Sequence, residues 1–229
     1  MRAQTEGRTD VDDPILPTGQ LLALGTSTLS DALDRLSIAG QCFGIKPLEP
    51  TFQMVGRAFT VRYGPIGVDG GSVGDYIDDV APGQVVVLDN AGRVDVTVWG
   101  DLLTLTASRR GVAGFVIDGV CRDSLRSVEL HYPIFSRGSW MRTGKDRVRV
   151  EEMGGTVQVG GVRVRAGDAL VGDRDGVLAL PAERLDAILE AARQIAGAEA
   201  EIRARVEAGS TLREARDALG YHQLQSANR

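Results

Sequence analysis

Short runs of strand type alternate with segments of helical periodicity, and this alternation constrains the fold more than any other feature. Three β-branched runs, each bounded by Gly, Pro or Asn, are "MVGRAFTVRY" (54–63), "QVVVLDN" (84–90) and "GFVIDG" (114–119). Apolar side chains recur at helical spacing in residues 26–36, 72–81, 101–110 and 123–130. Strands that alternate with helices in this way predict an α/β domain with layered packing.

The second part of the chain has a different residue pattern. From Val148 onward, β-branched and polar residues alternate between Gly-Gly and Asp-Gly turns, which predicts hairpins. Pro181 precedes a long helical segment, and a last helix is expected over 211–219. We predict a loose lead-in over 1–20, one α/β domain over 21–197 and a charged helical tail over 198–229. The tail is expected to act as a scaffold or subunit contact.

Charge and hydropathy exclude several classes of protein. The 229 residues carry a net charge of −5, which gives no support for nucleic-acid binding. No apolar stretch approaches the ~20 residues needed to span a bilayer, and the polar start does not resemble a signal-peptide core. Cys42 and Cys121 cannot build a disulfide framework, and each reads as a small buried residue rather than a nucleophile. We therefore expect a cytoplasmic protein that binds neither nucleic acid nor membrane.

Two segments at strand-to-helix transitions combine exposed backbone N–H groups with charged side chains. In "WGDLL", Gly100 lets a ligand approach the backbone, and the N–H groups of Leu102 and Leu103 lie in the first turn of a helix. In "CRD", the Arg122 guanidinium can fork onto a carboxylate or an enolate oxygen, and Asp123 can bind a hard divalent cation. Each segment also has a simpler interpretation, since Asp101 suits a helix start and an Arg-Asp pair is often solvated.

The order and spacing of these segments resemble the RraA-like family, which includes the 4-hydroxy-4-methyl-2-oxoglutarate aldolases. The resemblance runs from about Thr26 to the long C-terminal helix. It is carried by "STLSDALDRL", "GIKPLEP", "MVGRAFTVRY", "APGQVVVLDNAG", "VWGDLLTLTASRRGVAGFVIDGVCRD", "PIFSRG" and "VRAGDALVGDRDGVLALP". It implies a single layered α/β/β/α domain of the swivelling β/β/α type, and a homotrimer or homohexamer with sites between subunits.

The resemblance also implies roles for the residues. The backbone of Gly100, Asp101, Leu102 and Leu103 would bind the carboxylate of a 2-oxo acid, Arg122 its keto oxygen, and Asp123 Mg²⁺ or Mn²⁺. The two charges would then face one substrate rather than each other. Cleavage of a 4-hydroxy-2-oxo diacid and decarboxylation of oxaloacetate both pass through a pyruvate enolate, which a divalent cation and Arg122 would stabilise.

The remaining steps follow from the residues. Asp101 is a candidate to position or deprotonate a water. Lys46 and Lys145 lie outside these motifs, so a metal-assisted route suits the sequence better than a Schiff base.

One position departs from the family pattern. Arg126 stands three residues after Asp123, where the aldolases usually carry an acid, and it is expected either to pair with Asp123 or to turn outward. The family also contains non-catalytic proteins that regulate ribonuclease E by protein contact and lack the metal Asp. Retention of Asp123 favours the lyase over this alternative.

Overall fold

A computed structural model describes residues 15–67 and 73–221. Its main sheet contains β1 (Lys46–Pro47), β2 (Met54–Pro65), β3 (Gln84–Thr97), β4 (Gly114–Val120), β5 (Ile134–Ser136), β6 (Val148–Met153), β9 (Ala169–Asp173) and β10 (Gly176–Leu180). The order is β1-β5-β4-β3-β2-β9-β10, and β6 pairs with the second half of β2. Strands β2 to β5 are mutually parallel. The sheet nearly closes on itself, because Gln41, ahead of β1, bridges to Leu178 of the far strand β10.

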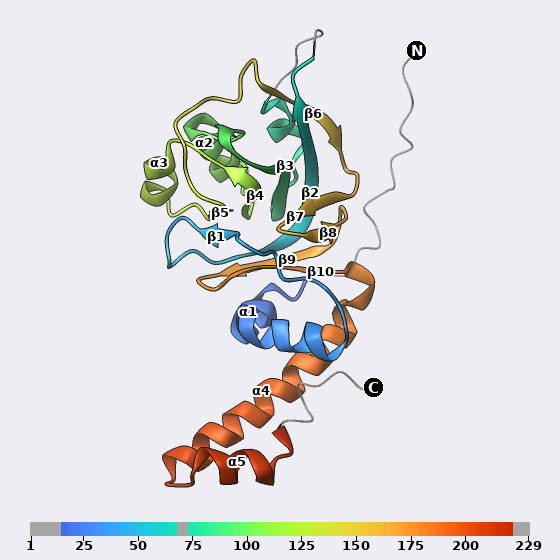
Figure 1. The fold of residues 1–229 in the computed structure, drawn as a ribbon, viewed down its shortest axis with the longest axis vertical. Coiled ribbons are helices and arrows are strands. Elements are labelled where there is room, and N and C mark those ends of the chain that lie inside the picture. Colours follow the sequence, from blue (N-terminus) through green and yellow to red (C-terminus); the bar gives the residue numbers. More distant parts are fainter. Residues whose placement is uncertain (1–14, 68–72, 222–229) are drawn as a thin grey trace.

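Helices cover the sheet in separate groups (Figure 1). Their bounds are α1 (Thr18–Arg35), η1 (Asp75–Asp79), α2 (Asp101–Arg109), α3 (Ser124–Glu129), η2 (Ala182–Arg184), α4 (Leu185–Glu207) and α5 (Leu212–Ala218). One core lies between the parallel strands and α2, and a second is closed by the hairpin of β7 (Val157–Val159) and β8 (Val162–Val164). A third core joins β9 and β10 to α1 and α4. The predicted α/β fold class is confirmed.

Helix α1 starts earlier than the sequence suggests. It begins at Thr18, inside the expected lead-in over 1–20, of which residues 1–14 lie outside the described part of the chain. A kink at Gly25, with φ of 73°, divides it. The backbone N–H of Thr26 donates to Asp173 Oδ2 at 2.8 Å, and its hydroxyl donates to Oδ1 at 2.7 Å. The cap of the second half of α1 therefore comes from Asp173 of β9.

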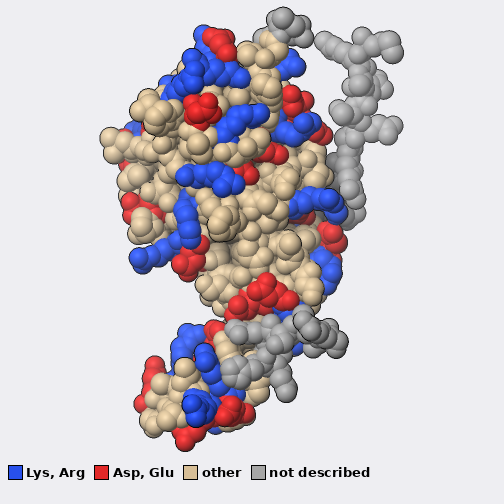
Figure 2. All heavy atoms as spheres, in the orientation of Figure 1, with Lys and Arg blue, Asp and Glu red and all other residues tan. Residues whose placement is uncertain are grey.

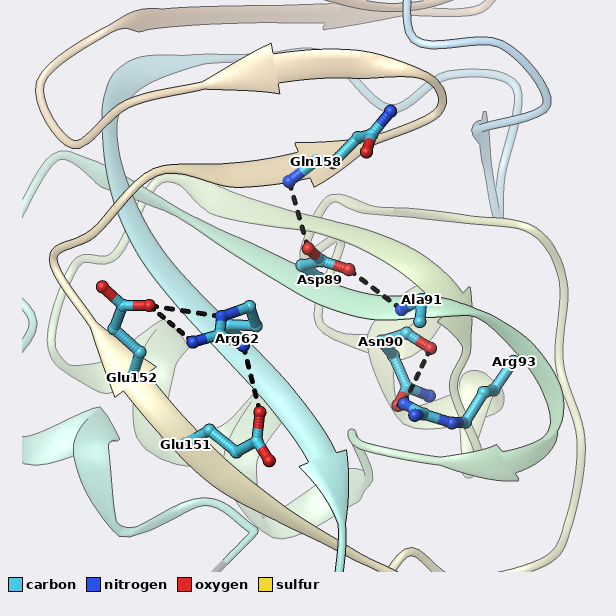
Figure 3. Close-up of polar contacts among 8 residues, drawn as sticks. All are labelled: Arg62, Asp89, Asn90, Ala91, Arg93, Glu151, Glu152 and Gln158. Atoms are coloured by element: carbon cyan, nitrogen blue, oxygen red, sulfur yellow. Dashed lines mark hydrogen bonds and ion pairs between the residues drawn. The ribbon is translucent and has the colours of Figure 1, made fainter.

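Buried carboxylates fasten the β7–β8 hairpin to the parallel strands. Asp89, at 9 % exposure, accepts hydrogen bonds from the backbone N–H groups of Ala91 at 2.9 Å and Gln158 at 3.1 Å (Figure 3). Asp118, its partner on β4, accepts from Gly160 N–H and pairs with Arg137. Because both carboxylates are committed to these donors, we assign them a structural role.

The C-terminal end of α4 projects away from the sheet, and α5 packs against this part of α4 (Figure 1). Ile202 of α4, Ala215 of α5 and Tyr221, which follows α5, form a small separate cluster. Figure 2 shows basic and acidic side chains side by side on this arm, and Arg205 pairs with Glu201 at 2.6 Å. Within the described residues, no helix combines the length and apolar character required to cross a bilayer.

Candidate functional site

Parallel pairing of β3 with β4 explains why two motifs separated in sequence meet in space. Each strand is followed at its carboxyl end by a short connection and a helix, α2 after β3 and α3 after β4. The backbone N–H of Arg122 donates to the carbonyl of Trp99 at 2.9 Å, so the two connections are directly bonded. The indole of Trp99 is buried on Phe115, with ring centroids 3.6 Å apart, which fixes this backbone.

The first turn of α2 is open to a ligand. Gly100 is its N-cap, with φ of −151°, and supplies no capping side chain. The indole N–H of Trp99 donates to Thr104 Oγ1 at 2.9 Å, and Thr104 N–H donates to the Gly100 carbonyl at 3.1 Å. The N–H groups of Leu102 and Leu103 precede that first helical bond and lack helical partners. They are therefore free to bind an anion, and binding of a carboxylate there stays a prediction.

A cavity of about 180 Å³ lies against this turn. Its lining includes Gly100, Asp101, Leu102, Leu103, Arg122 and Lys145. The structure thus brings together every residue predicted to bind substrate. A ligand pocket for a drug-sized molecule is usually ~300–1,000 Å³, so this one suits a small organic acid.

Asp123 lies just beside this cavity, on a neighbouring hollow of about 280 Å³ that Arg122 also lines. Its φ of 55° is left-handed, and its side chain does not cap α3. Asp123 Oδ2 accepts from Asp101 N–H at 3.4 Å and lies 3.5 Å from Arg122 Nε. No described residue donates a hydrogen bond to Oδ1. One carboxylate oxygen thus remains open to a cation.

That the two charges face one substrate stays a prediction, and in this structure they contact each other. Arg122 and Asp123 form an ion pair, with side chains 42 % and 41 % exposed. Such an exposed pair is worth only ~0–1 kcal/mol, so a ligand can separate it at little cost. The alternative in which Arg126 pairs with Asp123 is excluded, because Arg126 Nη1 binds Glu129 Oε2 at 3.1 Å.

Lys145 was not predicted to belong to the site. It reaches the cavity from the segment between β5 and β6, which pairs with the end of β3 through a bridge between Thr143 and Thr97. The only local sign in the sequence is Gly144, where a β-carbon would collide with the Thr97 carbonyl. Sequence reasoning had no means to place this loop beside Gly100.

The cysteines are not nucleophiles of this site. Both are free and buried. Burial raises the pKa of Cys121, directly before Arg122, to about 11, and that of Cys42 to about 12. Within the described residues, no group of three His, Cys, Asp or Glu side chains is placed to hold a metal.

A larger hollow of about 540 Å³ lies between α1, residues 41–46 and β10. Lys46 lines this hollow, and its ammonium group already donates a hydrogen bond to the Asp175 carbonyl at 2.5 Å. The smaller cavity carries the open N–H groups and Arg122, so we place the chemistry there.

Comparisons with known proteins show the family of this chain. A profile described as "RraA-like: Aldolase/RraA" matches residues 26–179. Protein DlpA of Legionella pneumophila is 38% identical over 209 residues, covering 89% of this chain but 34% of DlpA, so the chain spans about a third of that relative. A Halalkalibacterium halodurans protein with the name "Putative 4-hydroxy-4-methyl-2-oxoglutarate aldolase" is 35% identical, covering 76% of this chain and 81% of its own length.

Solved structures show the same fold. An uncharacterized protein from Pseudomonas syringae superposes with a TM-score of 0.80 at 38% identity, covering 86% of this chain and 95% of its own. Streptomyces coelicolor RraAS2, described as an unusual member of the RNase ES inhibitor RraA protein family, gives a TM-score of 0.76 at 27% identity, covering 82% and 96%.

Proposed function

The chain belongs to the RraA-like family, and from this premise we propose that it is a divalent-metal-dependent lyase. It would cleave a 4-hydroxy-2-oxo diacid, or decarboxylate oxaloacetate, through a pyruvate enolate. The observation that carries the proposal is that the open first turn of α2 and Arg122 line one small cavity, with Asp123 directly beside it. The aldolase names of several relatives support a lyase of this kind.

Substrate binding would begin with the carboxylate next to the keto group. The N–H groups of Leu102 and Leu103 point out of the first turn of α2, where the helix dipole adds a partial positive charge. Arg122, on the same cavity, would release Asp123 and turn its guanidinium to the keto oxygen. Cleavage of the adjacent carbon–carbon bond places negative charge on that oxygen, and a fixed cation there lowers the barrier.

Asp101 would handle the proton. It is exposed at the start of α2 and lines the cavity, and no described residue donates a hydrogen bond to its carboxylate. A carboxylate in that position can accept a proton from the 4-hydroxyl through a water, or return one to the enolate carbon. Both cleavage and decarboxylation need the second of these transfers, so one site serves both reactions.

The residues fit a divalent cation. Mg²⁺ usually keeps several waters and needs only one or two carboxylates plus substrate oxygens, and Asp123 Oδ1 is open beside the cavity. We propose Asp123 as the direct ligand for Mg²⁺ or Mn²⁺. When bound, the cation supplies positive charge to the carboxylate and keto oxygens of the substrate.

The experiment that tests this function is pyruvate release from oxaloacetate, measured above the rate that metal alone produces. We expect release to require Mg²⁺ or Mn²⁺ and to stop when a chelator is added. A chain without such release, toward oxaloacetate and toward a panel of 4-hydroxy-2-oxo diacids, would contradict the proposal. The same panel would identify the preferred substrate.

The second candidate is a non-catalytic regulator of a ribonuclease E type enzyme. The likeness to RraAS2 favours it, because that protein is described as a member of an RNase ES inhibitor family. Slower RNA cleavage by ribonuclease E in the presence of a chain that lacks metal-dependent turnover would support this function instead.

We also propose a homotrimer or homohexamer in the cytoplasm, with the site at a subunit boundary. Four large apolar side chains of this region stand open. Leu102, at 74 % exposure, lines the cavity, and Trp140 at 44 % and Met141 at 71 % line the neighbouring hollow. Leu125, at 69 %, follows Asp123 by two residues. Such a patch is typical of a surface that another protein covers. An acid from a neighbouring copy would then complete the metal shell. The two free thiols are usual in a reducing compartment.

Light scattering tests the assembly. We expect a mass of three or six chains, and we expect Leu125→Asp to reduce the mass and the turnover together. A stable and fully active monomer at micromolar concentration would contradict this proposal.

A further inference from the structure

Lys145 is, with Arg122, one of two residues with cationic side chains among those that line the cavity. It lines the same space as Arg122, Leu102 and Leu103, although it comes from a loop that neither motif contains. Its described contacts use only its backbone: the N–H donates to Thr143 Oγ1 at 3.2 Å, and the carbonyl accepts from Arg147 at 3.1 Å. Within the described part of the chain, no carboxylate forms an ion pair with its ammonium group.

The loop that carries Lys145 is held firmly to β3. Thr97 N–H donates to the Arg142 carbonyl at 3.0 Å, and Thr97 Oγ1 donates to it at 2.9 Å. On the other side, the N–H groups of Arg147 and Val148 donate to the Gly144 carbonyl at 2.9 and 3.0 Å. Lys145 therefore sits between two anchored ends, three residues in sequence from the strand that follows. Its backbone has a fixed position relative to Gly100.

The positive groups of the cavity exceed what a monocarboxylate needs. The first turn of α2 serves one carboxylate, and Arg122 serves the keto oxygen of the proposed substrate. Lys145 then has no role toward the 2-oxo acid head. A flexible ammonium group at the rim suits a second carboxylate, which it binds as a point charge without a demand for planar geometry.

We propose that Lys145 binds the distal carboxylate of the substrate and so restricts the site to 2-oxo diacids. This rests on the proposed function and adds to it the residue that selects the diacids. Lys145 is a specificity residue, and it takes no part in bond cleavage. The head of the substrate would be held by α2 and Arg122 whether or not the distal carboxylate is present.

The test compares two unreactive acids of equal chain length, 2-oxoglutarate and 2-oxopentanoate, by calorimetry in the presence of Mg²⁺. We expect the wild-type chain to bind the diacid more tightly. Lys145→Met should raise the Kd of 2-oxoglutarate roughly 10- to 100-fold, as expected for loss of a charge-assisted hydrogen bond, and leave that of 2-oxopentanoate within about 2-fold. Lys145→Arg should keep most of the preference.

Lys46 provides the matched control, because it is the only other lysine in the chain and lies on the larger hollow beside α1. We expect Lys46→Met to leave both Kd values unchanged. In turnover, Lys145→Met should raise KM for 4-hydroxy-2-oxo diacids and remove the preference of the enzyme for these diacids over 4-hydroxy-2-oxopentanoate.

The assignment would be overturned if the wild-type chain bound the two acids equally or bound neither. It would also be overturned if Lys145→Met kept the preference for 2-oxoglutarate, or if it raised the Kd of both acids equally. Reduction by borohydride with pyruvate that adds mass at Lys145 would show a Schiff base instead, and Lys145→Arg would then be inactive. A Lys145-dependent preference in a chain without metal-dependent pyruvate release would refute the lyase and leave the diacid site standing.

Discussion

A β-carbon added to Gly100 would lie 2.9 Å from Asp123 Oδ2 and 3.3 Å from Arg122 Nε. The backbone of Gly100 is extended, so alanine fits it, and the change acts on the two charged side chains. We expect Gly100→Ala to lower kcat/KM for pyruvate release roughly 10- to 100-fold through their displacement. The free energy of unfolding, measured with denaturant, should change by less than ~1 kcal/mol. Wild-type turnover would mean that neither side chain is needed where it lies.

Substitutions at Asp123 can remove its negative charge without a change in the stability of the fold. Its left-handed φ of 55° is tolerated by asparagine, whereas alanine there would add ~1–2 kcal/mol of strain. We expect Asp123→Asn to lose metal-dependent turnover and keep the wild-type midpoint of denaturation. Asp123→Gly is the control, since it should be equally inactive and at least as stable. Wild-type metal dependence in Asp123→Asn would remove this residue from the metal site.

Arg122 is expected to need its planar fork. In Arg122→Lys the charge remains, but the two parallel N–H donors are lost. By analogy with an oxyanion-hole donor, we expect kcat to fall ~10²–10³-fold, which corresponds to ~2.7–4 kcal/mol. A solvated ion pair with Asp123 would instead give a change near zero. Oxaloacetate decarboxylation distinguishes these results directly.

Arg126 should matter little to the chemistry, although it occupies a position that is usually acidic in the aldolases. It binds Glu129, and both side chains are about half exposed. We expect Arg126→Ala to leave turnover and the Kd for Mn²⁺ within about 2-fold, and to change stability by less than ~1 kcal/mol. A large rise in metal affinity would show that Arg126 reaches Asp123 in solution.

The thiols of Cys42 and Cys121 should react only slowly with thiol reagents in the folded chain. Burial raises the pKa of Cys42 to about 12 and of Cys121 to about 11, so the fold favours the neutral thiol. This stabilisation is complete below the unfolded pKa of ~8.5 and is lost as pH rises toward the folded values. We expect slow reaction with a disulfide reagent at pH 8, rapid reaction of two thiols in denaturant, and declining stability above pH ~9. Rapid native reaction would contradict the burial.

Local signals predicted most elements, and tertiary contacts explain the exceptions. Helix α2 ends at Arg109, ahead of Gly111 with φ of 71°, as the basic residues and glycine indicate. Helix α1 was placed too late because Gly25 resembles a break, whereas Leu21 before it is fully buried in the core with α4. Strand β3 continues to Thr97 through a bend at Ala91 and Gly92, which in the sequence looks like an end.

The sequence predicts the part of the candidate site that depends on neighbouring parallel strands. It does not predict the part that depends on the long loop between β5 and β6. Gly100 and Arg122 meet because β3 and β4 are parallel neighbours. Lys145 reaches the cavity only through pairing of Thr143 with Thr97, a contact without a local pattern. The sequence left open whether Arg122 and Asp123 contact each other, because neighbours in the chain can point their side chains apart, and the structure places Arg122 Nε 3.5 Å from Asp123 Oδ2.

The bond from Arg122 N–H to the Trp99 carbonyl fixes the two motifs at one end of β3 and β4, while the turn between α2 and β4 lies at the other. There, Gly83 N–H, just ahead of β3, donates to the Gly111 carbonyl at 2.8 Å. An insertion or deletion at residues 110–113 would thus change the backbone at the end of β4 that lies a full strand length from Gly100 and Arg122. The site therefore does not require an interval of 22 residues between Gly100 and Arg122, and a chain with a different interval can build the same site.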